Sequence, residues 1–555
     1  MTDSRDSHLA LPNLGYDFVT AVTQNSINAA IIDHLDFKQQ KAASVCFVVE
    51  NGKQTYIPFE ELLKRTNGTD PFMIEEFPED KKPNDDPGIQ NLITAKFLRG
   101  FRCRLGNPPM TDDDAVPDFV TLGSDTKRVN FKLLCAECAV VEYRPAAPDY
   151  FEAKWTHRKQ RKDDPWIFEA KVDLRLDPIV NEGYGKLPKD VQDRIKNLGD
   201  TAFSVEQLIF DFTNASLSGR PKWVNPDDDL GHMLTGGPFS GKYYDILRER
   251  GEPLLGCVIK NEDPSLPEAS LDLTDFDFKV CPFLDSDGKA VQEQGLATLN
   301  YLCATGGRRV ENRNPPTWNW LTEAEGKDTH GVISINRNTL AEYLRPTLEL
   351  YFLSNCLAPW VSCTYDSGAV VYKYRFDQQG TGTDLKQNPE GDTLFEVSWY
   401  RKAHDASKAW AAFTINWEYK ANVKFKGNAI IVTQYVDMYM SITADIRGGG
   451  AHVIRETVTD TNTFGVAHGK LRVKSNRHCD DTSELPHPQW KSMFPGYSKA
   501  INNLINITKY RKESLENFTI PIISDFVFPG GKTFSPQEAK FSKYQDLVCN
   551  IRYMS

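Results

Sequence analysis

Residues Phe413 to Ile446 constrain the fold most, because their side chains alternate between apolar and polar over a length that few strands reach. On the first arm the apolar residues occupy every odd position: Phe413, Ile415, Trp417, Tyr419, Ala421, Val423 and Phe425. On the second arm they occupy even positions: Ile430, Val432, Val436, Met438, Met440, Ile442, Ala444 and Ile446, interrupted by Gln434. This alternation predicts two strands with one buried face each. Gly427-Asn428 between the arms predicts a two-residue hairpin turn.

The predicted ribbon needs an apolar cover. At about 3.3 Å per residue, each arm spans on the order of 40 to 55 Å. Leaving its apolar face in water would forgo on the order of 10 to 20 kcal/mol, as much as the net stability of a whole domain. The cover can be a long helix, a second sheet or a bound lipid-like molecule. Choosing among these is the central question about function.

The composition indicates a globular protein and argues against nucleic-acid binding. The chain has 555 residues and is 40% hydrophobic, so it can bury one large core or two to three ordinary ones. Its net charge is -11 at pH 7, and its 65 basic residues are spread along the chain rather than clustered. A sequence-independent nucleic-acid binder needs a basic surface. We therefore expect no nucleic-acid partner.

The sequence shows no targeting segment. The first residues carry acidic side chains and no long apolar run, so they do not read as a secretory signal. The most apolar stretch, Leu348 to Tyr365, contains Glu349 and Pro359 and is too polar to cross a bilayer, so we expect no transmembrane segment. Eleven cysteines, an odd number, favour reduced thiols. These features predict a soluble cytoplasmic protein, or one exported by a non-standard route.

Two helices are predicted to accompany the strands. Asp17 to Leu35 has apolar residues on one side and polar residues on the other, which is typical of an amphipathic helix. A second helix, capped by Asn336 or Asn338, carries Leu340, Leu344, Leu348, Tyr351 and Phe352 at helical spacing, and Pro346 should kink it.

The order of the elements suggests a division of the chain. We expect a flexible N-terminus over residues 1–14, an N-terminal part over 15–325 and a C-terminal part over 330–555, although one continuous elongated unit fits as well.

Three motifs suggest chemistry, and each has a simpler interpretation. Gly236 to Lys242 matches the first positions of a phosphate-binding loop, but Tyr243 stands where Ser or Thr is needed, so a turn is favoured. Cys135 and Cys138 form a single CxxC pair inside a predicted strand, where residues three apart face opposite sides, so they should not share a metal. His478-Cys479 with His487 lacks a fourth zinc ligand. We predict no catalytic residue, no metal and no cofactor.

The candidate ligand-binding residues are those on the apolar faces of the predicted helices and of the second arm. Methionines adapt to variable apolar partners, and an inward Gln434 needs a polar partner, a water or a ligand headgroup. Burial in the core is the simpler interpretation of the methionines. The candidates for an apolar groove are Val22, Ile27, Ile31, Leu340, Leu344, Ile430, Val432, Gln434, Val436, Met438, Met440 and Ile442.

Three segments resemble a known family. The segments are Gly15 to Val19, Gly331 to Asn336, and Phe526 to Phe534 continuing to Val548. They resemble tubular lipid-binding (TULIP) proteins, particularly the accessory proteins encoded beside botulinum-type neurotoxins. The resemblance implies an α+β, β-rich fold with a long, highly curved antiparallel sheet wrapped around long amphipathic helices, leaving an apolar groove. It carries no catalytic motif.

Three hypotheses follow for the function. The leading one is a lipid or hydrophobic small-molecule binding protein with a groove between sheet and helices. The second is a toxin-accessory module that binds a protein partner and fills its own core. The third is an enzyme acting on an enclosed hydrophobic substrate.

Overall fold

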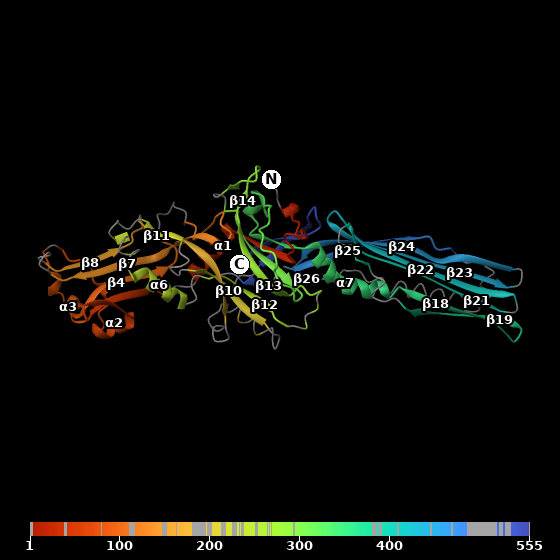
Figure 1. Cartoon of the computed structure of the whole chain (residues 1–555), viewed down its shortest axis with the longest axis horizontal. Coiled ribbons are helices and arrows are strands. Elements are labelled where there is room, and N and C mark those ends of the chain that lie inside the picture. The colour runs from red at the N-terminus through yellow and green to blue at the C-terminus, as the bar shows by residue number, and fades with distance from the viewer. Residues whose placement is uncertain are drawn as a thin grey trace.

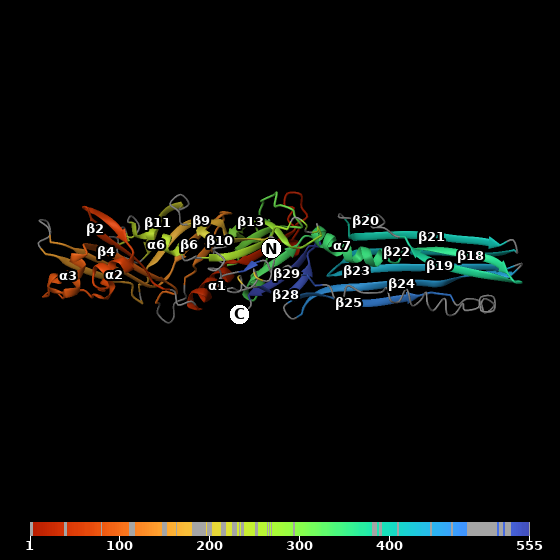
Figure 2. The ribbon, with the colours of Figure 1, turned by 90° about the horizontal axis from the view of Figure 1, so that it is seen from below.

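The protein is an elongated rod in which the long sheet predicted from the sequence forms one end (Figures 1 and 2). The computed structural model describes residues 4–37, 41–78, 80–109, 117–146, 152–162, 164–179, 192, 196, 203–211, 218–224, 230–231, 234, 238–249, 254–263, 265, 267, 269–291, 295–379, 386–387, 391–407, 410–444, 447–467, 470–484, 519–520, 526–527 and 534–553. Within these residues, no helix has both the length and the apolar content that a bilayer crossing needs.

A six-stranded antiparallel sheet occupies the middle of the rod and joins distant parts of the chain (Figure 1). In sheet order its strands are β13 (Leu273–Cys281), β16 (Thr298–Thr305), β1 (Phe18–Thr23), β17 (Gly331–Ile335), β29 (Leu547–Tyr553) and β28 (Phe534–Phe541). Every residue of β1, β16 and β17 is buried. The sheet takes strands from both sides of the predicted division at residues 325–330, and that division stays a prediction.

Two further sheets form the end of the rod that carries the N-terminal half of the chain (Figure 1). The first contains β3 (Lys53–Ile57), β2 (Ala43–Glu50), β4 (Phe97–Leu105), β7 (Cys135–Arg144) and β8 (Lys154–Lys159). The second contains β27 (Phe526–Val527), β12 (Leu254–Asn261), β10 (Phe203–Asp211), β9 (Ile167–Ile179), β6 (Arg128–Leu133) and β5 (Val120–Leu122), with β11 (Ser218–Val224) paired to β9. The helical elements here are α2 (Phe59–Arg65), η2 (Pro71–Met73), η3 (Pro83–Asp85), α3 (Pro87–Thr94) and α6 (Pro238–Glu249). η1 (Ser4–Asp6), the hairpin β14 (Phe283–Leu284) with β15 (Ala290–Val291), and η5 (Glu325–Lys327) lie outside these sheets.

The opposite end is a long, curled antiparallel sheet built around the predicted hairpin (Figures 1 and 2). Its strands in order are β20 (Lys386–Gln387), β21 (Thr393–Ser407), β22 (Ala411–Lys426), β23 (Ala429–Ala444), β24 (Arg447–Ala467), β25 (Lys470–Asp481) and β26 (Thr519–Ile520). The separate hairpin β18 (Leu357–Asp366) with β19 (Ala369–Gln378) and the helix α7 (Arg337–Leu353) lie beside it.

The structure confirms the ribbon and its register. β22 and β23 are each 16 residues long, and they pair from Ala411 with Ala444 to Lys426 with Ala429. Gly427 supplies the turn with a φ of 58°, a left-handed conformation that glycine adopts without strain. The predicted inward residues Trp417 and Ile442 are buried. Ile446 lies outside the described residues.

The chain supplies the apolar cover of the ribbon itself. The indole Nε1–H of Trp417 donates to the carbonyl of Asn355, just after α7, at 3.0 Å, and its ring packs against Phe376 of β19 at 5.4 Å between centroids. Trp399 of β21 likewise donates to the carbonyl of Leu357 at 2.8 Å. The cover is therefore part helix and part second sheet, two of the possibilities that the sequence left open.

The helices differ from the prediction. Phe18 to Thr23 forms strand β1 and only then does helix α1 (Gln24–Phe37, 14 residues) begin, so the predicted helix over Asp17 to Leu35 is wrong in its first third. The predicted polar face of α1 is only partly solvated. Asp33 is exposed, whereas Asn28 is buried and its amide exchanges hydrogen bonds with the backbone of Val120 in β5 at 2.8 and 2.9 Å. The described residues thus show a β-rich fold with helices of 17 residues at most, and not a sheet wrapped around a pair of long helices.

Helix α7 follows the prediction more closely. Asn336 is its cap, accepting the backbone N–H of Asn338 at 2.9 Å, and Pro346 lies inside the helix. Leu340, Leu344, Leu348 and Phe352 are buried.

Two cysteine predictions are corrected. Cys103 of β4 and Cys138 of β7 form a disulfide, so not all thiols are reduced. Cys135 and Cys138 do not face opposite sides, because the register between β4 and β7 shifts at Arg104/Leu105. Such a bulge inserts one extra residue and turns the strand by one face, and both cysteines are consequently buried while Glu137 between them is exposed.

The segment Gly236 to Lys242 is not the predicted turn over its described residues. Pro238 begins helix α6, and Lys242 lies inside that helix and pairs with Asp245 at 3.3 Å. Residues 235–237 lie outside the described residues, as does His487.

A buried carboxylate fastens the N-terminal segment to the central sheet. Asp546, which directly precedes β29, is fully buried and accepts hydrogen bonds from the Ser7 hydroxyl at 2.9 Å, the Leu9 N–H at 2.7 Å and the Arg337 N–H at 3.2 Å. Leu9 and Leu14 are buried nearby. The flexible N-terminus expected over residues 1–14 stays a prediction. Burial raises the pKa of Asp546 to about 6, and these hydrogen bonds only partly oppose the rise.

We expect the stability contribution of Asp546 to fall as the pH rises from 4 to 7. Because its folded pKa lies above the usual value of 3.8, the contribution is fully present below pH 4 and is lost as the pH passes about 6, by roughly 3 kcal/mol. The asparagine in Asp546→Asn does not titrate. The difference in unfolding free energy between wild type and this variant, measured by urea melts, should therefore change by the same amount between pH 4 and pH 7. Asp287→Asn, at an exposed residue, is the control. A pH-independent difference for Asp546→Asn would contradict the prediction.

The inward face of the ribbon gives a second prediction. Trp417→Ala should lower the unfolding free energy by about 3 to 5 kcal/mol, because it empties a packed site and orphans the Asn355 carbonyl. Trp410→Ala, at a side chain that is 82% exposed, should change it by less than about 0.5 kcal/mol. Urea unfolding of the two variants measures both, and equal effects would show that the ribbon does not bury this face as described.

Candidate functional site

The predicted groove residues lie together in one core. Val22 lies in β1, Ile27 and Ile31 in α1, Leu340 and Leu344 in α7, and the others in β23. All the apolar ones belong to a single hydrophobic cluster that runs through the molecule, and none is more than 9% exposed: Val22, Ile27, Ile31, Leu340, Leu344, Ile430, Val432, Val436, Met438, Met440 and Ile442. Their role toward a ligand stays a prediction.

Gln434 finds its polar partners within the chain. Its Oε1 accepts the hydroxyl of Tyr419 at 2.9 Å, and its Nε2 donates to the hydroxyl oxygen of Tyr351 on α7, also at 2.9 Å. Burial raises the pKa of both phenols, so they remain protonated. The amide therefore ties α7 to the long sheet and needs no ligand headgroup.

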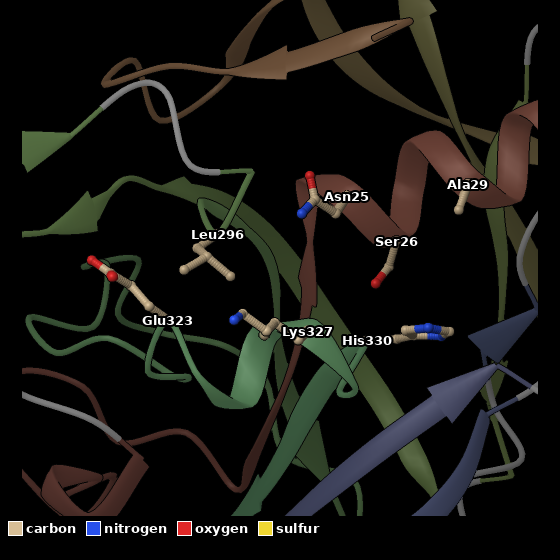
Figure 3. A pocket seen from close by; sticks show the side chains of 8 residues that line it. Asn25, Ser26, Ala29, Leu296, Glu323, Lys327 and His330 are labelled. Carbon is tan, nitrogen blue, oxygen red and sulfur yellow. The ribbon is translucent and has the colours of Figure 1, made fainter. Parts of the chain in front are cut away.

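A cavity of about 600 Å³ lies elsewhere, where α1 begins (Figure 3). We name it the α1 pocket. The residues that line it come from three segments: Asn25, Ser26 and Ala29 of α1, Leu296 before β16, and Glu323, Gly326, Lys327 and His330 around η5 and before β17. Figure 3 shows Lys327 and His330 on the side facing the start of α1. No predicted groove residue lines it.

Local sequence explains why α1 starts at this point. The hydroxyl oxygen of Thr23 accepts the backbone N–H of Ser26 at 3.2 Å, as a helix cap does. The backbone N–H groups of Gln24 and Asn25 donate to the carbonyls of Ala297 and Gly295 at 2.8 and 3.0 Å. The first helical amides thus already have partners, so the helix start itself does not offer an anion site.

Two glycines allow the walls of the α1 pocket to approach. A Cβ on Gly326 would collide with the side chain of Leu296, and one on Gly295, whose φ is 64°, would collide with the amide of Asn25. Glu325 holds the short helix η5 in place by accepting the N–H and hydroxyl of Thr322, both at 2.9 Å, and by pairing with Lys540 at 3.3 Å. Burial acts to raise the pKa of Glu325, but these partners outweigh it and lower the pKa.

The α1 pocket carries one positive and one negative side chain at its rim. Lys327 and Glu323 are both exposed at its rim, and neither has an ion-pair partner among the described residues. A ligand that carries an acidic group can therefore approach the Lys327 ammonium without first breaking an internal pair.

Ser26 and His330 do not form a nucleophile and base in this arrangement. The Ser26 hydroxyl shares a hydrogen bond of 2.7 Å with the Thr23 hydroxyl. Nδ1 of His330 accepts the backbone N–H of Tyr553 at 3.0 Å, so the neutral ring carries its proton on Nε2. A ring in that tautomer cannot take the proton of a serine at Nε2.

Sequence reasoning missed the α1 pocket because its residues come from separate segments with no common motif. Gly295 precedes a buried strand and Gly326 lies in a polar stretch, and nothing in the sequence indicates that the two lie close together.

Comparison with known proteins finds distant structural likenesses. No protein-family model matches the chain, and neither does any curated protein sequence. Three solved structures align with 97% of it. P47 of Clostridium botulinum E1 does so at 9% identity and a TM-score of 0.41 over 98% of its own chain, and P47 from Clostridium botulinum A2 at 9% identity and 0.38 over 97%. A lipopolysaccharide binding protein aligns at 10% identity and a TM-score of 0.30 over 100% of its chain.

The close approach at Gly326 gives a prediction for the α1 pocket. Gly326→Ala should lower the unfolding free energy by about 1 to 3 kcal/mol, because the added methyl must displace the buried side chain of Leu296. Gly465→Ala is the matched control, since nothing lies within 4 Å of a Cβ at that residue. Thermal melts of both variants measure the effect, and an unchanged Gly326→Ala protein would mean that the wall is loose.

Proposed function

We propose that the protein binds an amphiphilic small molecule of the lipid class at the α1 pocket and does not transform it. The observation that carries the proposal is the cavity of about 600 Å³ with an unpaired ammonium at its rim, a volume within the usual range for small-molecule sites. Ala29 and Leu296 offer apolar surface to a hydrocarbon chain, while the Lys327 ammonium offers donors to an acidic head.

A ligand would occupy the groove predicted from the sequence only after the structure around that groove had rearranged. The β23 residues of that groove lie in the same hydrophobic cluster as the buried residues of α7, and Gln434 already bonds to Tyr351 of α7 and to Tyr419. A ligand in that groove would have to separate α7 from the long sheet and break both hydrogen bonds. The same proposal includes the relationship to tubular lipid-binding proteins that the sequence suggests. A long sheet with one apolar face and α7 beside it supports this relationship.

A protein-interaction module with a self-filled core is the second candidate. The satisfied amide of Gln434 favours it, because a core without open polar groups has no need of a ligand.

Fluorescence of a dansyl-labelled fatty acid tests the proposal. Wild-type protein should enhance the probe emission with saturation, and Lys327→Met should weaken its binding about tenfold, which corresponds to about 1.4 kcal/mol for one charge-assisted contact. Lys53→Met, at an exposed lysine of β3, is the matched control and should bind as wild type does. Native mass spectrometry of the purified protein gives an independent readout of bound lipid.

Two results would separate the candidates. Binding at the α1 pocket is supported if the probe binds saturably and Lys327→Met weakens this binding. Met438→Gln should then reduce binding only in proportion to the loss of folded protein. Wild-type protein that neither enhances the probe nor carries lipid overturns ligand binding and leaves the interaction module.

A further inference from the structure

Three buried cysteines meet between strands β4 and β7, far from the α1 pocket in sequence. Cys103 lies on β4 and Cys135 and Cys138 on β7, and their sulfur atoms all lie within 4.8 Å of one another. All three side chains are buried, at 2% exposure or less. The proposed function makes no use of this cluster.

The bulge between the two strands creates the cluster. Cys138 pairs with Cys103, but Cys135 pairs with Leu105, because the register shifts between Arg104 and Leu105. The extra residue on β7 returns Cys135 to the face that Cys138 occupies. Gly106 follows with a φ of 147°, and a Cβ there would press on the Cβ of Ala136 at 3.0 Å, so the glycine leaves room for the bulge.

The cluster is enclosed by apolar and aromatic side chains from α6. The Tyr243 side chain of α6 is buried, and its ring packs against Phe101 of β4 at 5.5 Å between centroids. Phe239 packs against the same Phe101 ring at 5.8 Å. Burial raises the pKa of the Cys135 thiol to about 12, so without a metal this thiol keeps its proton. Such an enclosure also leaves little space for a water ligand.

We propose that, when the Cys103–Cys138 disulfide is reduced, the three cysteines bind one Cu(I) ion through their sulfur atoms. Sulfur ligands select soft ions such as Cu(I) and zinc. Zinc almost always takes four ligands in structural sites, and the cluster offers three sulfurs with no fourth His, Cys, Asp or Glu ligand atom among the described residues. Cu(I) accepts three thiolates without a fourth ligand.

The chemistry balances in two steps. A dithiol reductant such as dithiothreitol gives two electrons and two protons to the disulfide and becomes a cyclic disulfide itself, leaving three thiols in the cluster. Cu(I) then replaces up to three thiol protons, which go to the solvent. The disulfide and the metal therefore exclude each other, since two of the three ligands are shared between them.

Anaerobic titration of the full chain tests the proposal. The protein is reduced, freed of reductant and titrated with Cu(I) in the presence of bicinchoninate, which competes for the ion. We expect one ion per chain bound against the chelator, with thiolate-to-copper absorption in the near ultraviolet. Cys135→Ser should weaken binding at least tenfold, and it leaves the Cys103 and Cys138 pair able to form its disulfide, so folding can be checked by circular dichroism.

Two controls complete the design. Cys281→Ser removes a buried free cysteine in the central sheet and should bind Cu(I) as wild type does. Protein with the disulfide intact should bind no ion against the chelator. Equal binding by wild type and Cys135→Ser, binding by the oxidised chain, or retention of Zn2+ in preference to Cu(I) would each overturn the proposal.

Discussion

The burial of one face of a 32-residue ribbon, two strands of 16 residues each, is the constraint from which the architecture follows. A sheet that is apolar on one side must find a second layer, and here that layer comes from the chain itself. α7 covers one stretch and the β18–β19 hairpin another, each anchored by a tryptophan N–H that reaches a backbone carbonyl. A buried indole N–H needs a hydrogen-bond acceptor, and in an apolar interior such an acceptor lies only at defined places. The two tryptophans therefore fix the position of the layers relative to the ribbon as well as burying apolar area.

Buried carboxylates hold the parts of the rod together where apolar packing alone would allow sliding. Asp17 accepts the N–H of Thr305 at 2.7 Å, the Thr339 hydroxyl on α7 at 2.8 Å and the Arg308 guanidinium at 2.9 Å. Asp546 does the same for the N-terminal segment and the first residue of α7. Hydrogen bonds are directional where apolar contacts are not. The two aspartates consequently set how the helix leaves the central sheet and meets the ribbon.

How much of this could be predicted depended on whether the signal was local. The β22–β23 hairpin could be predicted because its alternating apolar and polar residues and its turn residues are consecutive in the sequence. α1 was misjudged at its start because Phe18 to Thr23 is buried on both faces, and a continuous apolar run of that kind does not distinguish strand from helix. The orientation of Cys135 depended on a bulge against β4, which no property of the CxxC sequence reveals. The α1 pocket brings Asn25 together with Leu296 and Lys327, which follow it by more than two hundred residues in the sequence, and only the fold does this.

The central sheet sets the order in which the chain can fold. β1, made from residues 18–23, has as its neighbours β16 and β17, and the next strand outward is β29, made from residues 547–553. Contacts between such remote segments form slowly, because the entropy cost of closing a long loop comes before any favourable contact forms. On the ribosome, β17 keeps an open edge until more than two hundred further residues have emerged. An unpaired, apolar edge of this sort invites pairing with another chain, so the edge of β17 is exposed to wrong pairing until β29 covers it.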